Sequence, residues 1–206
     1  MKKLVCLSGN PWLATPNRTQ QLITRLKDIE ILFFEPYSSG RSRREERRMR
    51  ANITVSTLPV PLPEKSKGGL AQRRAMYRLT KFLEKTLQKH RFRDFILWTD
   101  DPRYHALVAS LPHSGLIYDC DREWDDLPLE WESELALQAD VAFAASSGLI
   151  ERLTPCCDNI ALIPNGVNYP MFSRDDWEMP GILRGRDRPI LCRVRSEEHT
   201  SELQSR

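Results

Sequence analysis

The sequence predicts an α/β fold with a Rossmann-like, doubly wound and mainly parallel sheet, and two observations lead to this prediction. Short apolar runs, typical of strands, alternate along the chain with segments whose apolar residues recur every three or four positions, as on one face of a helix. Several of the short runs end in small or polar residues that begin a loop. Strands that alternate with helices form βα units, and such units assemble into a parallel sheet.

Seven strands are predicted in chain order. They cover residues 4–7, 29–34, 53–58, 95–98, 116–118, 141–145 and 160–163. The helices between them are predicted at 17–26, at 70–90, from 99–102 onwards, at 133–138 and, capped by Ser146 or Ser147, as far as Leu153. The helix at 70–90 has the clearest pattern, because Leu79, Leu83 and Leu87 recur every four residues with basic residues between them.

The domain organisation is expected to change near residue 180. Residues 1–180 are predicted to form one domain, and 181–194 a polar linker followed by the first strand of a second domain. From Arg195 through Ser205 the chain matches, residue for residue, the translation of a common sequencing-library adapter. We interpret residues 195–206 as an artefactual tail joined to a truncated reading frame and exclude it from the fold. A native polar C-terminus is the alternative.

The composition is that of an ordinary soluble globular protein, with 40% apolar and 8% aromatic residues. No apolar run approaches the ~18 residues of a membrane span, and the apolar run after Met1 is too short for a signal peptide. The five cysteines show no paired or metal-ligand spacing. We therefore expect a reduced, cytoplasmic protein. The cysteines are Cys6, Cys120, Cys156, Cys157 and Cys192.

The net charge of +3 conceals a strong asymmetry. Residues 41–93 hold 16 lysines and arginines against 4 glutamates, a net +12, whereas residues 94–140 hold 12 acidic residues against 2 arginines, a net −10. The arginines at 41–50 are expected in a long loop. The basic segment can dock on an anionic membrane surface, where each basic side chain adds ~1 kcal/mol, and a solvated helix face is the alternative. Nucleic acid is not expected as a partner, because aromatic residues are sparse there and no binding motif is present.

Polar residues follow several of the predicted strands, and ligands of open α/β sheets bind beyond the carboxyl ends of the strands. Gly9, Asn10 and Trp12 follow the first strand. The glycine permits a tight turn, and backbone N–H groups of this loop can face phosphate or sugar oxygens. A plain strand-to-helix turn is the alternative.

Carboxylates follow the fourth and fifth predicted strands. Asp119 and Asp121 can orient sugar hydroxyls or act as a general base toward an acceptor hydroxyl, with a loop cap as the alternative. Asp100 and Asp101 are adjacent, and two neighbouring carboxylates without further ligands rarely hold a hard cation. We therefore expect a helix cap and no metal at this pair, and keep Asp100 as a substrate-binding candidate.

Residues 163–172 read Ile-Pro-Asn-Gly-Val-Asn-Tyr-Pro-Met-Phe and follow the last predicted strand. Locally they form a turn, in which Gly166 suits a positive φ and Asn165 can hydrogen-bond to its own turn backbone. The string, with Phe172 at the matching distance, resembles the P-N-G-V-[DN]-x-x-x-F signature of nucleotide-sugar glycosyltransferases with the GT-B fold, in the large retaining group. In that family the segment ends the N-terminal, acceptor-side domain, so Pro164, Asn165 and Gly166 are expected to form the interdomain turn.

Two further motifs resemble a subgroup of these enzymes that acts on envelope polysaccharides. Residues 8–12 are similar to its S-x-N-P-W opening. Tyr118-Asp119-Cys120-Asp121 is similar to its Y-D-C-x-D-[DE]-W motif, although here Cys120 meets the second aspartate directly. The departure leaves two interpretations, a deleted residue or an aspartate that is not the family's counterpart.

The resemblance implies an enzyme that transfers a sugar from a nucleotide-diphosphate sugar to a cell-envelope polysaccharide or a lipid-linked acceptor, at the inner face of the membrane. It implies no metal and no cofactor besides this donor. The donor-binding residues of the family lie in a second domain, so the chain is expected to be inactive alone. The alternative from another class is a stand-alone α/β module that binds a nucleotide or an anionic surface without catalysis. The expected catalytic residue is Asp119, and the expected acceptor-binding residues are Gly9, Asn10, Trp12, Asp100 and Asp121.

Overall fold

The computed structural model describes residues 2–12, 16–38, 46–62, 69–176, 178, 181, 184 and 185. They belong to two compact units, one up to Asn165 and one from Gly166 onwards, and the second contains the short helix α6 (Tyr169–Phe172). The predicted linker and strand at 181–194 lie outside the described residues except at 181, 184 and 185, and the tail at 195–206 lies outside them altogether. The domain boundary expected near residue 180 stays a prediction.

The first unit is built on one eight-stranded sheet with the order β3-β4-β2-β1-β5-β6-β7-β8. β3 pairs with β4 in antiparallel fashion, and the other neighbours pair in parallel. The order runs outward from β1 in both directions, so the sheet is doubly wound, and the predicted Rossmann-like α/β class is confirmed. The strands are β1 (Lys2–Leu7), β2 (Ile29–Glu35), β3 (Glu46–Arg50), β4 (Ile53–Thr57), β5 (Ile96–Thr99), β6 (Gly115–Cys120), β7 (Val141–Ala144) and β8 (Ile160–Leu162).

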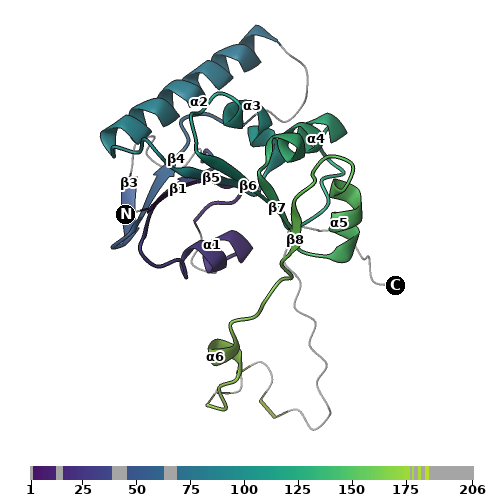
Figure 1. The fold of residues 1–206 in the computed structure, drawn as a ribbon. Helices are drawn as coiled ribbons and strands as arrows, with labels where there is room; N and C mark the ends of the chain where they lie inside the picture. The colour runs from purple at the N-terminus through teal and green to yellow at the C-terminus, as the bar shows by residue number, and fades with distance from the viewer. Residues whose placement is uncertain are drawn as a thin grey trace. The chain divides into compact units, whose positions relative to one another are not determined.

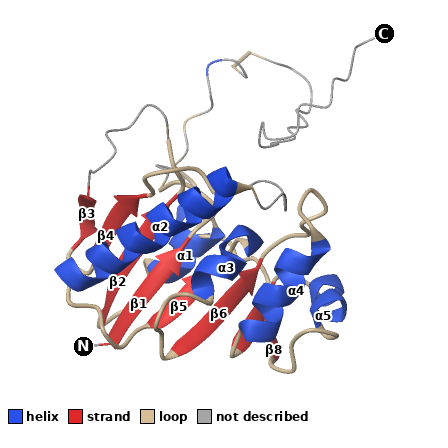
Figure 2. Cartoon of the chain, turned by 90° about the horizontal axis from the view of Figure 1, so that it is seen from above, coloured by secondary structure: helices blue, strands red, loops and turns tan. Residues whose placement is uncertain are grey.

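Helices cover both faces of this sheet. One face carries α2 (Leu70–Lys89), α3 (His105–Val108), α4 (Leu129–Gln138) and α5 (Ser147–Leu153), whereas α1 (Arg18–Ile23) lies on the other (Figure 1, Figure 2). The larger core cluster joins the sheet to α2–α5 and includes Leu83 of α2 and Leu135 of α4. The smaller cluster, on the α1 face, joins Ile23 to Phe33 and Trp98. Burying one such side chain fully contributes about 1.5–3 kcal/mol, so these two layers hold the strand ends in place.

Strand β3 corrects the loop expected at 41–50, as far as residues 46–50 are concerned. Its sequence, Glu-Arg-Arg-Met-Arg, lacks the apolar alternation of a buried strand, because it forms the sheet edge and its last three residues are exposed. Charged residues are common on edge strands, where they discourage pairing with other chains. Glu46 also ties this edge to the end of α2, since it accepts from the Lys89 ammonium at 2.7 Å and lies 3.0 Å from His90 Nε2.

The helices agree with the predicted segments and differ from them at some ends. α4 begins at Leu129 and contains residues 133–138, the segment predicted to be helical. α5 is capped by Ser146, one of the two serines proposed, whose hydroxyl accepts from the Leu149 amide at 3.4 Å. α2 begins at the predicted residue and ends one residue before His90.

Candidate functional site at the strand ends

The carboxyl ends of β1, β5 and β6 lie side by side at one edge of the sheet. The register aligns Leu7, Thr99 and Tyr118 across these three strands. The next residue of each strand therefore lies at the same level, and two of the predicted site carboxylates come together there. These next residues are Ser8, Asp100 and Asp119.

Asp100 is buried, and both of its carboxylate oxygens accept hydrogen bonds. Its Oδ1 accepts from the Gly9 amide at 2.6 Å, and its Oδ2 accepts from the hydroxyls of Ser8 at 2.9 Å and Thr19 at 2.6 Å. The Ser8 hydroxyl accepts in turn from the Asn10 amide at 3.1 Å. Desolvation raises the pKa of Asp100 to about 6, although the three hydrogen bonds act against this rise. Asp100 thus fixes the β1–α1 loop, and its predicted contact with substrate stays a prediction.

Asp101 provides the helix cap predicted for this aspartate pair. Its Oδ1 accepts from the Arg103 amide at 2.9 Å, at the start of the 3-10 helix η1 (Pro102–Tyr104), and its carboxylate also pairs with the Arg103 guanidinium. The carboxylate lies against Gly9, where an added Cβ would overlap Oδ2 and come within 2.9 Å of the Asp101 Cβ. Gly9 is not among the glycines with positive φ. Close packing, and not a special turn, therefore requires glycine at this position.

Asp119 is paired with Arg18, a residue to which the sequence pattern does not point. Nε of Arg18 donates to Oδ1 at 3.1 Å and to Oδ2 at 3.2 Å, and Nη2 donates to Oδ1 at 3.0 Å. The Arg18 side chain is 9% exposed and that of Asp119 is 0% exposed. Burial raises the pKa of Asp119, the Arg18 guanidinium acts to lower it, and the charge of Asp121 adds to the rise. The expected catalytic carboxylate is therefore a buried group whose charge Arg18 balances.

Asp121 differs from the other three aspartates of this edge. It is half-buried, and within the described residues no neighbouring side chain donates a hydrogen bond to its carboxylate. Burial raises its pKa, Arg122 and Arg18 act to lower it, and Asp101 acts to raise it. Its lone pairs can accept hydrogen bonds from sugar hydroxyls without breaking an internal ion pair.

The loop after β1 is held from the other side by Glu35, at the end of β2. Glu35 Oε2 accepts from the Trp12 amide at 2.9 Å, and Oε1 accepts from Arg47 Nη2 and Thr57 Oγ1, both at 2.5 Å. The Trp12 ring packs edge-on against Phe33, with ring centroids 5.1 Å apart. Trp12 is thus fixed through both its backbone and its ring, and its predicted role toward the acceptor stays a prediction.

The turn after β8 corrects one local expectation. Pro164, Asn165 and Gly166 are exposed. Gly166 lacks the positive φ expected for it, which among the described glycines occurs at Gly185. Asn165 Oδ1 accepts from Arg18 Nη1 at 3.0 Å, a contact to another element that the turn chemistry alone does not indicate. The role of this segment as an interdomain turn stays a prediction.

Three charged residues of this region were not identified from the sequence. They are Arg18, Glu35 and Glu132. Glu132 of α4 accepts from the Tyr118 hydroxyl at 2.9 Å and from Arg152 Nε at 2.8 Å. Arg18 lies 101 positions from its partner Asp119, and Glu35 lies 23 positions from Trp12. Pairing over such separations leaves no local pattern, so only the fold could reveal it.

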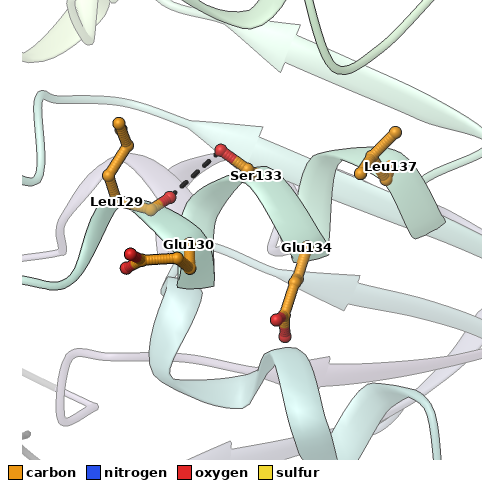
Figure 3. A pocket seen from close by; sticks show the side chains of 5 residues that line it. All are labelled: Leu129, Glu130, Ser133, Glu134 and Leu137. Carbon is orange, nitrogen blue, oxygen red and sulfur yellow. Dashed lines mark hydrogen bonds between the residues drawn. The ribbon is translucent and has the colours of Figure 1, made fainter. Parts of the chain in front are cut away.

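A shallow, open hollow in the described part of the chain lies away from this edge. It has a volume of about 320 Å³ and runs along one exposed face of α4 (Figure 3). Its two leucines, Leu129 and Leu137, are 64% and 69% exposed. A hollow along a single helix brings no groups together from different strands, so the strand-end edge is the better candidate site. The lining residues are Leu129, Glu130, Ser133, Glu134 and Leu137.

The part of the chain that the structure describes contains no candidate metal-binding cluster. No three His, Cys, Asp or Glu residues there are grouped so that they could hold a metal ion. Cys6, Cys120, Cys156 and Cys157 are free thiols, and Cys192 lies outside the described residues. Among the described helices, none has the length and apolar character needed to cross a membrane.

The similarity of this chain to known proteins lies in its structure. The sequence matches no protein-family model and none of the curated proteins. Sucrose-phosphate synthase from Thermosynechococcus elongatus superposes with a TM-score of 0.54 at 10% identity, over 82% of this chain and 92% of that chain. The trehalose-6-phosphate synthase of E. coli bound with UDP-2-fluoro glucose gives 0.51 at 13% identity, over 75% and 42%. OtsA in its apo form gives 0.52 at 13% identity, over 75% and 43%.

These neighbours are glycosyltransferases with the GT-B fold, and the described sheet has the Rossmann-like architecture found in them. At identities of 10–13% the likeness establishes the fold. The chain spans only 42% and 43% of the length of the last two neighbours.

Proposed function

We propose that this chain is the acceptor-side lobe of a retaining glycosyltransferase with the GT-B fold. The complete enzyme transfers a sugar from a nucleotide-diphosphate sugar to a cell-envelope polysaccharide or a lipid-linked acceptor, in the cytoplasm or at the inner face of the membrane. The carboxylates at the ends of β5 and β6 support this proposal, because they line the edge where sheets of this kind bind ligands. One structural neighbour was solved with a bound nucleotide sugar, UDP-2-fluoro glucose.

The two carboxylates at the end of β6 have different roles in this proposal. Asp119 is the catalytic group, with its charge set by Arg18, and Asp121 receives and orients hydroxyls of the acceptor. Gly9 and Asn10 bring backbone atoms to the same edge, and Trp12 stands next to them on the loop that Glu35 holds. Asp100 positions this loop and completes the acceptor side.

The donor side belongs, in this proposal, to a second lobe. The leaving nucleotide diphosphate needs electrostatic stabilisation, which usually contributes more to the rate than any other single effect, and the family places those groups in the second domain. Residues 181–194 are then the linker and first strand of that domain, and 195–206 a tail foreign to the gene.

The genomic locus tests this arrangement directly. Sequencing the DNA downstream of the codon for Val194 is expected to reveal an uninterrupted frame that continues into a second α/β domain. A natural stop codon close to Arg193, or a continuation into an unrelated fold, would contradict the proposal. The same reads show whether the adapter string exists in the genome.

An anionic membrane surface is the partner we propose for α2. No residue of this helix before Leu79 is fully buried, although Met76 is half-buried against the core. Leu70 and Tyr77 are 74% and 65% exposed there, next to basic side chains. An exposed apolar and aromatic residue among basic ones is typical of helices that lie on anionic lipid. The exposed basic residues of α2 are Arg73, Arg74, Arg78, Lys81, Lys85 and Lys89.

Co-sedimentation with vesicles tests this surface. The chain is expected to bind vesicles rich in phosphatidylglycerol, to release them as salt rises, and to ignore neutral vesicles. Replacing Arg73, Arg74 and Arg78 by glutamate abolishes binding, whereas Arg25→Glu, at an exposed position two residues after the end of α1, serves as a control for charge reversal elsewhere on the surface. Equal binding by the triple variant and the wild type would show that α2 is merely a solvated face.

A stand-alone binding module is the second candidate function, because the exposed basic face of α2 can bind an anionic ligand without the help of a donor lobe. The two candidates differ in nucleotide binding. The acceptor-side lobe alone is expected to show no saturable binding of UDP-glucose in calorimetry, whereas a nucleotide-binding module binds the nucleotide in the same experiment.

A further inference from the structure

We propose that Arg18 is a positioning residue that couples the carboxylate of Asp119 to the turn at which the chain leaves the first unit. The relevance of this coupling to catalysis rests on the proposed function, whereas the contacts of Arg18 and the experiment that tests the coupling do not. Three observations carry the inference: the fixed backbone of Arg18, the two-sided contacts of its guanidinium and the unequal burial of its two partners.

The backbone of Arg18 is fixed on both sides. Asn17 caps α1 by accepting from the Gln20 amide at 2.9 Å, and the Gln20 side chain bonds back to the Asn17 amide. Thr19, the next residue, is tied to Asp100 through its hydroxyl at 2.6 Å. Arg18 therefore starts from a well-defined position between two anchors, and its long side chain has a defined direction.

The guanidinium uses separate nitrogens for its two partners. Nε and Nη2 hold Asp119 at 3.0–3.2 Å, while Nη1 donates to Asn165 Oδ1 at 3.0 Å. A planar, five-donor group can make both contacts together, whereas the ammonium of a lysine presents a single point charge. The turn after β8 and the end of β6 are thereby held in one arrangement by one side chain.

The two partners of Arg18 differ in burial. Asp119 is fully buried, so its pairing with Arg18 contributes to the stability of the fold. Asn165 is exposed and is the last residue of the first unit, so its hydrogen bond contributes little to the core. That bond instead holds the turn at which the first unit ends.

The coupling has a functional consequence for a two-lobed enzyme. A change in the charge or position of the Asp119 carboxylate alters its hydrogen bonds with the Arg18 guanidinium. The movement of the guanidinium then alters its hydrogen bond to Asn165. The segment that leads to the second lobe thus responds to the state of the Asp119 carboxylate.

Backbone ¹⁵N relaxation of the 206-residue chain tests the coupling. In the wild type the Asn165 amide is expected to be rigid, with an order parameter near ~0.85. In Asn165→Ala it falls below about 0.6 while the unfolding midpoint stays unchanged. Asn165→Asp keeps an acceptor oxygen for Arg18 and restores the wild-type value. The matched control is Asn159→Ala, an exposed asparagine before β8 that bonds the Asp140 carbonyl, and it leaves residue 165 rigid.

Two variants at the other end test the transmission. Arg18→Lys keeps the charge but loses the double contact, so order at Asn165 falls although the fold persists. Asp119→Asn, which does not touch Asn165, lowers the same order parameter. A rigid turn in Asn165→Ala, or in both of these variants, would overturn the inference.

The outcome can be separated from that of the proposed function. A loss of order in Asn165→Ala together with a locus that encodes no second lobe sustains the coupling and rejects the enzyme. A rigid turn in that variant together with an encoded second lobe rejects the coupling and leaves the enzyme intact.

Discussion

Asp100 shows how the strand-end edge balances burial against hydrogen bonding. Its carboxylate has lost its water and receives three hydrogen bonds instead, from Ser8, Gly9 and Thr19. These bonds do not fully replace hydration, since the pKa remains raised to about 6. The ionised carboxylate of Asp100 therefore positions the β1–α1 loop but lowers the stability of the folded protein.

This cost predicts a pH dependence with a defined sign. The folded-state pKa of about 6 lies above the ordinary value of 3.8, so the folded protein keeps this proton to higher pH than the unfolded chain does. Stability from this group is therefore complete at low pH and is lost as pH rises from about 4 to about 6. The difference corresponds to about 3 kcal/mol.

Asp100→Asn removes this titration. The stability of the variant relative to the wild type is expected to increase by up to about 3 kcal/mol between pH 4 and pH 7. Urea unfolding of both proteins over this pH range measures the difference. A difference that is independent of pH would mean that Asp100 titrates in the folded protein as it does in the unfolded chain.

Gly9 and Gly148 form a matched pair of glycines for a test of close packing. At Gly9 an added methyl group overlaps the Asp101 carboxylate, so Gly9→Ala is expected to cost about 1–3 kcal/mol. At Gly148, in the first turn of α5, nothing lies within 4 Å, so Gly148→Ala is expected to stabilise by about 0.4–1 kcal/mol. Denaturant unfolding measures both, and equal effects of the two substitutions would contradict the packing argument.

At the scale of elements, burial decides which parts of the fold the sequence could predict. α2 was predictable because Leu79, Leu83 and Leu87 must face the core every turn. β3 was not, because an edge strand with exposed arginines needs no apolar alternation. Its partner β4 carries the pattern for the pair, with Ile53 and Val55 buried.

Only some residues of the candidate site could likewise be predicted from the sequence. Asp100 and Asp119 could be identified because the carboxyl ends of parallel strands meet at one edge, wherever the strands fall in the order. Arg18 could not, because its pairing with Asp119 spans 101 positions and depends on how α1 packs below the sheet. The fixed positive φ expected of Gly166 was wrong because a turn after a strand has several conformations open to it.

Helix α2 provides an element-scale test of the core. Leu83 is completely buried beneath the helix, whereas Leu70 in its first turn is 74% exposed. Leu83→Ala is expected to cost about 2–5 kcal/mol, and Leu70→Ala less than about 0.5 kcal/mol. The same pair separates stability from surface binding, since Leu70→Ala should weaken vesicle binding while leaving the unfolding midpoint unchanged. Similar costs for the two substitutions would mean that α2 is docked differently.

At the scale of the whole molecule, four aspartates gather at the strand-end edge and six exposed basic residues lie on α2. The sheet orients both: the loops after β1, β5 and β6 form the edge, and α2 covers one face. In the proposed function this lobe contributes acceptor groups and a membrane contact, and a second lobe contributes the groups that bind the diphosphate. The proposed function therefore makes a prediction about activity that depends on the second lobe.

The purified 206-residue chain is expected to transfer no sugar from UDP-glucose or related donors, because the proposed function assigns the groups that stabilise the leaving diphosphate to a second lobe. The complete product of the locus is expected to be active. In that protein Asp119→Asn should lower kcat about 10²–10⁴-fold, the usual contribution of a general base. Asp125→Asn is the control, since that carboxylate lies in the loop after β6 but is 80% exposed. Transfer by the short chain alone would refute the two-lobe proposal, and an unaffected Asp119→Asn enzyme would move the catalytic role away from Asp119 while leaving the two lobes in place.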